Sequence, residues 1–214
     1  IALVHALGSL SGKGRPLWLS WIAAAAFVQG ILYWSILARL MVLVVLPLGL
    51  AFAEEMEERW PPDLLRRVQV AGLIATLALS LTLAGVDHRF ASAQKEFAGE
   101  VAAQAGGRQV WFAGAWGFQY YMEQAGAKQV DDRAGWTEPK PGDLVALSAA
   151  DPHSPLPRGW KGVALRAEPV PYPMPLRLIG VFDSQAAFYS SALGFLPFAA
   201  SREPLDEFTL WEAQ

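Results

Sequence analysis

The sequence predicts α-helical transmembrane segments over residues 1–88, followed by a small extracytoplasmic α/β domain with a mainly parallel or mixed sheet over residues 89–214. Composition is the first reason, because 53% of the residues are hydrophobic and 17% are charged, which is too apolar for an ordinary soluble chain. The second is that the long uncharged stretches all lie before Asp87. The third is that short β-rich segments alternate with helical patterns from Asp87 on, where 11 basic and 15 acidic side chains occur.

The chain begins with Ile1, and its first ten residues, "IALVHALGSL", are apolar. They lack the charged start and the small-residue cleavage site of a secretory signal peptide. Such a stretch is typical of the end of an earlier helix. We therefore expect this chain to be the C-terminal part of a longer membrane protein.

Three further stretches have the length of membrane spans, since about 20 apolar residues cross roughly 30 Å of hydrocarbon. We expect spans at about Leu17–Tyr33, Ser35–Ala53 and Val68–Val86. The third is uncharged throughout. The second reaches full length only if Arg39 enters the membrane for a short distance.

Arg39 has two interpretations. Its guanidinium could contact the phosphate of a lipid-linked donor, because a cation inside a span is costly and often marks a ligand. Alternatively, its long side chain could extend to the headgroups one turn away. The sequence leaves both open.

Basic residues in short loops stay on the cytoplasmic side of a membrane. The basic clusters at residues 13–15 and 66–67 are separated by two expected spans, so they share a side. The acidic linker Glu54–Asp63 then faces the cytoplasm, and everything after Val86 lies outside it. We expect a multi-pass protein of the inner (plasma) membrane.

After Asp87, apolar residues at helical spacing from Phe90 predict an amphipathic helix that ends near Gly106 and Gly107. A strand, "QVWFAG", and a helix, "FQYYMEQAG", follow. The Pro-rich segments Pro152–Pro157 and Glu168–Pro175 are expected to be loops. Further short strands are predicted at "KQV", "DLVALSA", "GVALRAE", "LRLIG" and "FTLWEA".

The aromatic stretch "FAGAWGFQYYMEQAG" joins that strand to that helix, where ligands often bind in open α/β sheets. Gly114 and Gly117 would let a ligand approach the backbone closely, and Trp116 and Tyr120 could contact a sugar or a lipid headgroup. In the alternative, Trp116 and Tyr120 pack on a neighbouring strand or on the membrane surface. In that case Phe112, Phe118 and Tyr121 are core residues.

Other chemical signals are weak. The chain has no cysteine, its histidines (His5, His88, His153) are scattered, and it has no phosphate-binding "GxxxxGK" loop, so we expect no metal and no cofactor. Ser190 and Ser191 lack the sequence context of a nucleophile, and the adjacent Asp131 and Asp132 are typical of a solvated loop. A net charge of −3 without basic runs argues against nucleic acid as a partner.

Three stretches together resemble a known family: "ARLMVLVVLPLGLAFA", "GVDHRFASAQKEFA", and "WFAGAWGFQYYMEQAGAKQV…PKPGDLVA" with the later "FYSSALGFLPFAAS". They are similar to the C-terminal region of bacterial family-39-like membrane glycosyltransferases, of the GT-C class and related to protein O-mannosyltransferases. The resemblance extends from about Arg39 to Trp211. The chain departs from it at Leu40 and Ala115, where such proteins often carry Tyr and His.

The resemblance implies a polytopic enzyme that takes a sugar from a polyprenyl-phosphate donor and passes it to a glycan or protein acceptor. Its catalytic acidic residue would lie in a loop upstream of Ile1, so we assign no catalytic residue within this chain. The bilayer is the one further partner expected. The competing hypothesis is a non-catalytic, membrane-anchored binding or interaction module outside the cytoplasm.

Overall fold

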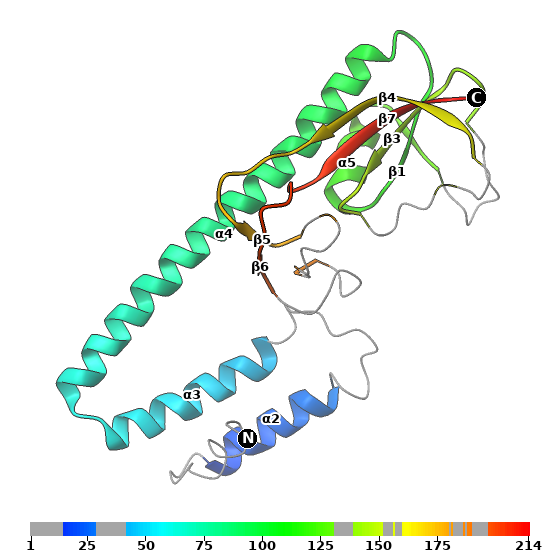
Figure 1. The fold of residues 1–214 in the computed structure, drawn as a ribbon. Coiled ribbons are helices and arrows are strands. Elements are labelled where there is room, and N and C mark those ends of the chain that lie inside the picture. Colours follow the sequence, from blue (N-terminus) through cyan, green and yellow to red (C-terminus); the bar gives the residue numbers. More distant parts are fainter. Residues whose placement is uncertain are drawn as a thin grey trace. The chain divides into compact units, whose positions relative to one another are not determined.

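A computed structural model describes the chain in two compact units, one made mainly of residues up to Leu81 and the other mainly of residues from Thr82 onward (Figure 1). The expected domain boundary, between residues 88 and 89, lies a few residues beyond this division and inside the same helix, α4. The residues described are 15–28, 42–130, 139–151, 156, 160–179, 181, 186, 188–189 and 197–214.

The first unit contains helices α2 (Arg15–Phe27) and α3 (Val42–Arg59). They contact each other through the Trp18 indole, whose Nε1 donates to Glu54 Oε2 at 2.9 Å. The prediction of an acidic linker at Glu54–Asp63 was wrong for its first half, because α3 continues to Arg59. Glutamate, methionine and arginine are strong helix formers, and Glu55 and Arg59 form an ion pair one turn apart.

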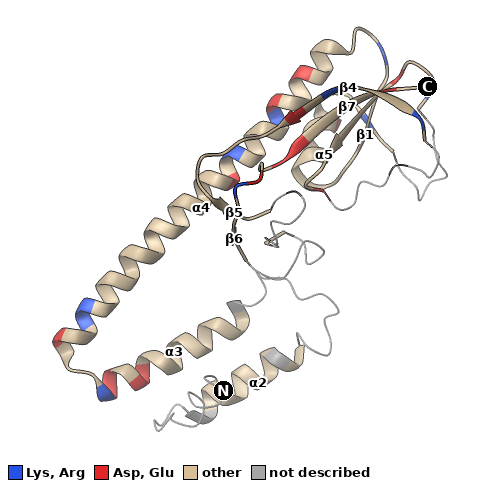
Figure 2. Cartoon of the chain, in the orientation of Figure 1, with Lys and Arg blue, Asp and Glu red and all other residues tan. Residues whose placement is uncertain are grey.

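Helix α4 (Pro62–Gln104) begins with a proline, which suits the first position of a helix, and contains the third expected span. Among the described helices it is the one long and apolar enough to cross a membrane, and none of its apolar window is buried by protein. Figure 2 shows this long uncharged part of α4 between a charged start and a charged second half. The described part of the first expected span is the 13-residue helix α2, and α3 carries five charged residues at its end.

The amphipathic helix expected from Phe90 is the second half of α4 and not a separate element. The segment between Val86 and Phe90 contains no Gly or Pro, so the helix continues through it. Its buried face is the one predicted from helical spacing. The core residues on that face are Val86, Phe90, Ala93, Phe97, Ala98 and Val101.

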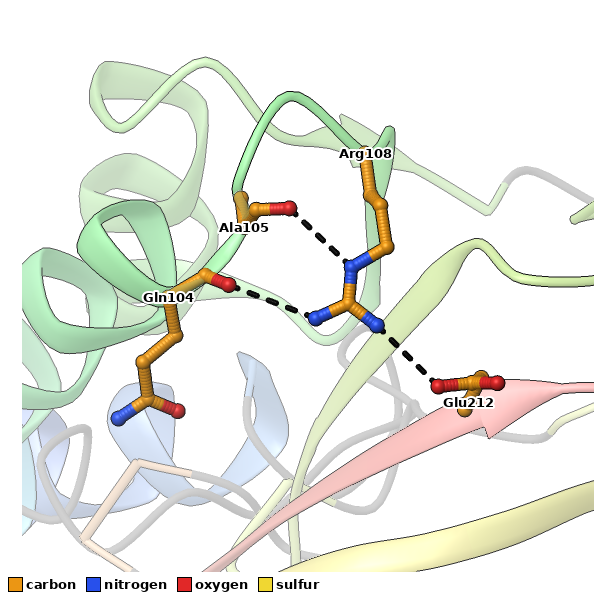
Figure 3. A network of polar contacts seen from close by, with 4 residues as sticks. All are labelled: Gln104, Ala105, Arg108 and Glu212. Atoms are coloured by element: carbon orange, nitrogen blue, oxygen red, sulfur yellow. Dashed lines mark hydrogen bonds and ion pairs between the residues drawn. The ribbon is translucent and has the colours of Figure 1, made fainter.

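The end of α4 is held to the sheet by Arg108 (Figure 3). Its guanidinium donates to the backbone oxygens of Gln104 and Ala105, to which no later N–H of the helix donates. It also forms an ion pair with Glu212 at 3.1 Å. Gly106 and Gly107 both have positive φ and turn the chain toward the first strand. The helix therefore ends where the sequence predicted.

The second unit is built on a mixed five-stranded sheet with the order β2-β1-β3-β7-β4. Strand β1 pairs in parallel with β2 and β3, whereas β7 pairs antiparallel with β3 and β4. The α/β fold and the mixed sheet agree with the prediction. The strands are β1 (Val110–Ala113), β2 (Lys128–Gln129), β3 (Leu144–Ser148), β4 (Gly162–Pro169) and β7 (Glu207–Ala213).

Two details of the predicted strands were wrong. The segment "LRLIG" contributes only β5 (Leu176–Arg177), which pairs with β6 (Ala199–Ala200) outside the main sheet. The expected loop Glu168–Pro175 starts inside β4. Strand β4 is at the edge of the sheet and, among the described strands, has only β7 beside it. Pro169 has no N–H, and at an edge strand no second neighbouring strand requires one.

Aromatic rings join α4, the sheet and helix α5 (Trp116–Gln124) into one core. Phe118 of α5 stacks on Phe97 of α4 with ring centroids 6.2 Å apart and on Phe208 of β7 at 5.8 Å. It also meets Phe112 of β1 edge-on at 6.1 Å. Both helices therefore cover the same face of the sheet, and the prediction that Phe112 and Phe118 are core residues is confirmed.

Candidate functional site

The turn between β1 and α5, residues Gly114–Gly117, lies at one edge of the sheet and is called the α5 turn below. Strands β1, β2, β3 and β4 all run in the same direction, since β3 and β4 are both antiparallel to β7. Their carboxyl ends therefore share one edge with the start of β7. We call this the carboxyl edge, and it is where ligands bind in open α/β sheets.

Trp116 is the first residue of α5 and has an unusual backbone. Its φ is +54°, and it is the one non-glycine residue with positive φ among those that the structure describes. This left-handed conformation costs roughly 1–2 kcal/mol for a residue with a side chain, and it is rare for bulky residues. The side chain is 42% exposed, so part of the ring is accessible at the surface.

Polar contacts with the next strands fix the α5 turn. The carboxylate of Asp151, just beyond β3, accepts a hydrogen bond from the N–H of Ala115. Gln129 of β2 donates from Nε2 to the backbone oxygen of Gly114 at 2.8 Å. The turn is thus held from both neighbouring strands, which is the condition under which a strained residue persists.

Both glycines of the α5 turn are closely approached, as predicted. A Cβ on Gly114 would lie 2.6 Å from Cδ1 of Phe118 and 3.3 Å from the Asp151 carboxylate. A Cβ on Gly117 would lie 2.5 Å from Oε1 of Gln94, which comes from α4. Neither position leaves room for a side chain without movement of its neighbours.

The aromatic residues of α5 divide into two groups. Phe118 and Met122 point into the core, whereas Tyr120 is 56% exposed and Trp116 is also on the surface. The Tyr120 hydroxyl accepts from Gln124 Nε2 at 2.8 Å, and its ring meets Tyr121 edge-on. Tyr121 is half-buried, so the prediction that it is a core residue is confirmed only in part. Of the four predicted contact residues, Trp116 and Tyr120 are exposed, Gly117 is half-buried and Gly114 is buried.

Several other predicted residues lie outside the part of the chain that the structure describes. Arg39 is one of them, so both of its interpretations stay predictions. The same holds for Asp131, Asp132, Ser190 and Ser191.

Three buried polar residues near the carboxyl edge were missed by sequence reasoning: Gln94, Asp151 and Asp206. The position of Asp151, soon after a predicted strand, was a usable signal because carboxyl ends of parallel strands meet at one edge. Gln94 falls on the buried face of α4 that the apolar spacing defined. Asp206 precedes the last strand, and no local pattern marks it.

Asp206 is fully buried and its carboxylate is surrounded by donors. Oδ2 accepts from Ser148 Oγ at 2.6 Å, and Oδ1 accepts from the N–H groups of Ala150 and Glu207. Burial raises the pKa of Asp206 from 3.8 to about 6, and these hydrogen bonds oppose the shift.

Two hollows elsewhere in the second unit do not include the α5 turn. A groove of about 460 Å³ between α4 and β4 is lined by charged and apolar residues, and its charged residues form ion pairs, among them Arg89 with Glu96 at 2.8 Å. The other, of about 480 Å³, lies beside Trp160 and Trp211, whose rings meet edge-on with centroids 5.9 Å apart. Neither combines backbone strain with an exposed ring.

Among the described residues, no cluster of three His, Asp or Glu side chains could hold a metal ion. The α5 turn instead offers an indole face, a carboxylate and the leading N–H groups of a helix. Comparison with protein-family models, with curated proteins and with solved structures finds no match to this chain.

Proposed function

We propose that this chain is the C-terminal part of an integral-membrane, glycosyltransferase-like protein, and that its α5 turn binds a sugar of the polyprenyl-phosphate donor or of the acceptor. The catalytic loop lies upstream of Ile1 in this proposal. The enzyme class rests on the resemblance of the sequence, and the binding role rests on the geometry of Trp116.

The conformation of Trp116 carries the binding role. A glycine would adopt φ +54° without strain, and an exposed ring contributes little to the core. Backbone strain at a residue with a side chain is typical of ligand-binding positions. The strained backbone and the exposed ring of Trp116 together support a contact with a ligand.

A sugar suits the surface around that ring. The apolar face of a pyranose packs on an aromatic ring, and its hydroxyls hydrogen-bond to carboxylates, amides and backbone N–H groups. Trp116 and Tyr120 supply the rings, and Asp151 and the first turn of α5 supply the polar partners.

Binding of a lipid-linked sugar tests this proposal. The full chain, labelled with 5-fluorotryptophan, is placed in nanodiscs that contain either polyprenyl-phosphate mannose or polyprenyl phosphate alone. We expect the ¹⁹F resonance that is missing in Trp116→Phe to shift with the mannose lipid only. The resonance missing in Trp60→Phe, an exposed tryptophan between α3 and α4, is the control and should not move.

An unchanged Trp116 resonance, or an equal shift with both lipids, would contradict sugar binding at the α5 turn. A non-catalytic binding module is separated from the enzyme by turnover of the longer protein. The enzyme predicts sugar transfer that falls in Trp116→Ala, and the module predicts binding without transfer.

The proposal also places the chain in the inner (plasma) membrane as a multi-pass protein, with the second unit outside the cytoplasm. Because the chain has no cysteine, an introduced cysteine is its only thiol, and labelling of that thiol shows on which side of the membrane the residue lies. In intact cells, a membrane-impermeant maleimide should label Gln104→Cys and should label Arg66→Cys only after lysis. Labelling of both positions, or of Arg66→Cys alone, would reject this topology.

A further inference from the structure

The loop between β4 and β5 presents an apolar surface. Its residues 171–175 read "PYPMP" and are called the PYPMP loop below. The three prolines and Met174 are exposed, Tyr172 is half-buried, and none of the five residues is charged. Single exposed apolar side chains are common on protein surfaces, but several together in one uncharged loop indicate an interaction surface.

The backbone of the PYPMP loop is fixed by the fold. Each proline restricts its own φ to about −65°. The buried guanidinium of Arg177 donates from Nη1 to the backbone oxygen of Met174 at 2.6 Å, and the N–H of Ser201 donates to that of Pro175 at 3.1 Å. The fold therefore holds Met174 at the surface.

The PYPMP loop contacts α4 at the end of the third expected span. A Cβ on Gly85 would lie 3.2 Å from the hydroxyl oxygen of Tyr172, and Figure 1 shows the chain passing beside α4 between β4 and β5. The uncharged residues 68–86 of α4 cover about 28 Å at about 1.5 Å per residue, close to the roughly 30 Å of hydrocarbon in a bilayer. Gly85 therefore lies at the edge of the hydrocarbon if α4 spans the membrane.

The surroundings of α4 change at the same level. Leu73, Leu77 and Leu81 are exposed, whereas Val86 is 2% exposed. Protein thus covers α4 from about Val86 onward, and the apolar surface before it is available to lipid. A tyrosine suits this boundary, because its ring is apolar and its hydroxyl is polar, and such rings gather at the headgroup level.

We propose that the PYPMP loop, seated on α4 by Tyr172, inserts Met174 and the neighbouring prolines into the headgroup layer of the bilayer. This inference rests on the membrane placement proposed above.

The loop would also orient the second unit. Strand β4 leads directly into it, and β1, β3 and β4 have their carboxyl ends at one edge of the sheet. An anchor at the end of β4 holds that carboxyl edge, and the α5 turn with it, toward the bilayer. A lipid-linked sugar could then reach the edge from the membrane surface.

Depth-dependent fluorescence quenching tests the proposal. Single cysteines at Met174, Leu165 and Leu73 of the full chain carry an NBD fluorophore, in nanodiscs of phosphatidylethanolamine and phosphatidylglycerol with a nitroxide on the headgroup or on the acyl chain. Leu165 is the matched control, because it is 48% exposed against 43% for Met174 and lies in β4, roughly 20 Å before the loop. Leu73 reports the span itself.

We expect the Met174→Cys label to emit at shorter wavelength than the Leu165→Cys label and to be quenched by the headgroup nitroxide. The acyl-chain nitroxide should quench the Leu73→Cys label. If Met174→Cys behaves like Leu165→Cys while Leu73→Cys is quenched, the span stands and the anchor is rejected. If Leu73→Cys is not quenched either, the membrane placement is rejected together with the anchor.

A pair of glycine variants tests the seating on α4. Gly85→Leu places a side chain against the Tyr172 hydroxyl and should reduce the quenching of the Met174→Cys label. Gly72→Leu, at a position in the same helix where a Cβ meets no described atom within 4 Å, should leave it unchanged. Equal quenching in the two variants would overturn the role of Tyr172.

Discussion

Two regions of the second unit differ in how their side chains are held. Around the segment of residues 203–206, Arg177 and Asp206 are fully buried, and both have several hydrogen-bond partners. At the α5 turn, Trp116 combines a strained backbone with a ring that is 42% exposed. Hydrogen bonds account for the buried side chains of the first region. The exposed ring on a strained backbone in the second region is the reason to propose a function for the α5 turn.

Arg177 shows how complete the first region is. Its guanidinium donates to the backbone oxygens of Met174, Leu176 and Glu203, at distances that include 2.6, 2.8 and 2.9 Å. Burial lowers the pKa of Arg177, and the nearby Glu203 carboxylate opposes that shift. The side chain holds the segment around β5 to the segment that follows β6.

Removing Arg177 should have the largest effect on stability. Arg177→Met removes a buried guanidinium that donates to three backbone carbonyls, so we expect a loss of about 3–5 kcal/mol in the free energy of unfolding. Urea unfolding of the full chain in detergent measures this, with the exposed Arg202→Met as a control that should stay within about 0.5 kcal/mol. A loss below about 1 kcal/mol for Arg177→Met would show that its hydrogen bonds do not stabilise this region.

Asp206 gives the next largest effect, and it depends on pH. Because its folded-state pKa is about 6 and its ordinary value is 3.8, the folded form holds the proton more tightly. Its contribution is therefore fully present below about pH 4 and is lost as the pH rises through 6, by up to roughly 3 kcal/mol.

Asp206→Asn isolates this term. The amide oxygen can accept from Ala150 and Glu207, and the NH₂ group can donate to Ser148 Oγ. The difference in unfolding free energy between parent and variant should change between pH 4 and pH 7 in the direction that disfavours the parent. A constant difference across that range would mean that Asp206 titrates normally.

The sequence predicted the α5 turn well because its signals are local. The spacing of Gly114 and Gly117 and the change from strand to helix pattern lie within a few residues of each other. The same locality explains why the buried face of α4 was found. It also explains the error at Asp87, where the onset of charge was interpreted as the end of a helix although no residue there interrupts it.

The polar partners of the turn could not be predicted in the same way. Asp151 lies 36 residues from Ala115, and Asp206 lies 58 residues from Ser148, so their contacts depend on how the strands are ordered. The approach of Gln94 to Gly117 likewise depends on how α4 and α5 pack. The strain at Trp116 has no sequence signal, because positive φ is not expected for a bulky residue.

Comparing Trp116→Gly with Trp116→Ala in the full chain tests most directly whether Trp116 serves a ligand or the fold. Both remove the ring, but only glycine adopts φ +54° freely, so Trp116→Gly should be more stable than Trp116→Ala by about 1 kcal/mol. Both should bind polyprenyl-phosphate mannose at least about tenfold more weakly than the parent, which equals about 1.4 kcal/mol. If both variants instead lose about 3–5 kcal/mol of stability, as for a buried tryptophan, or bind like the parent, the ligand role of Trp116 is contradicted.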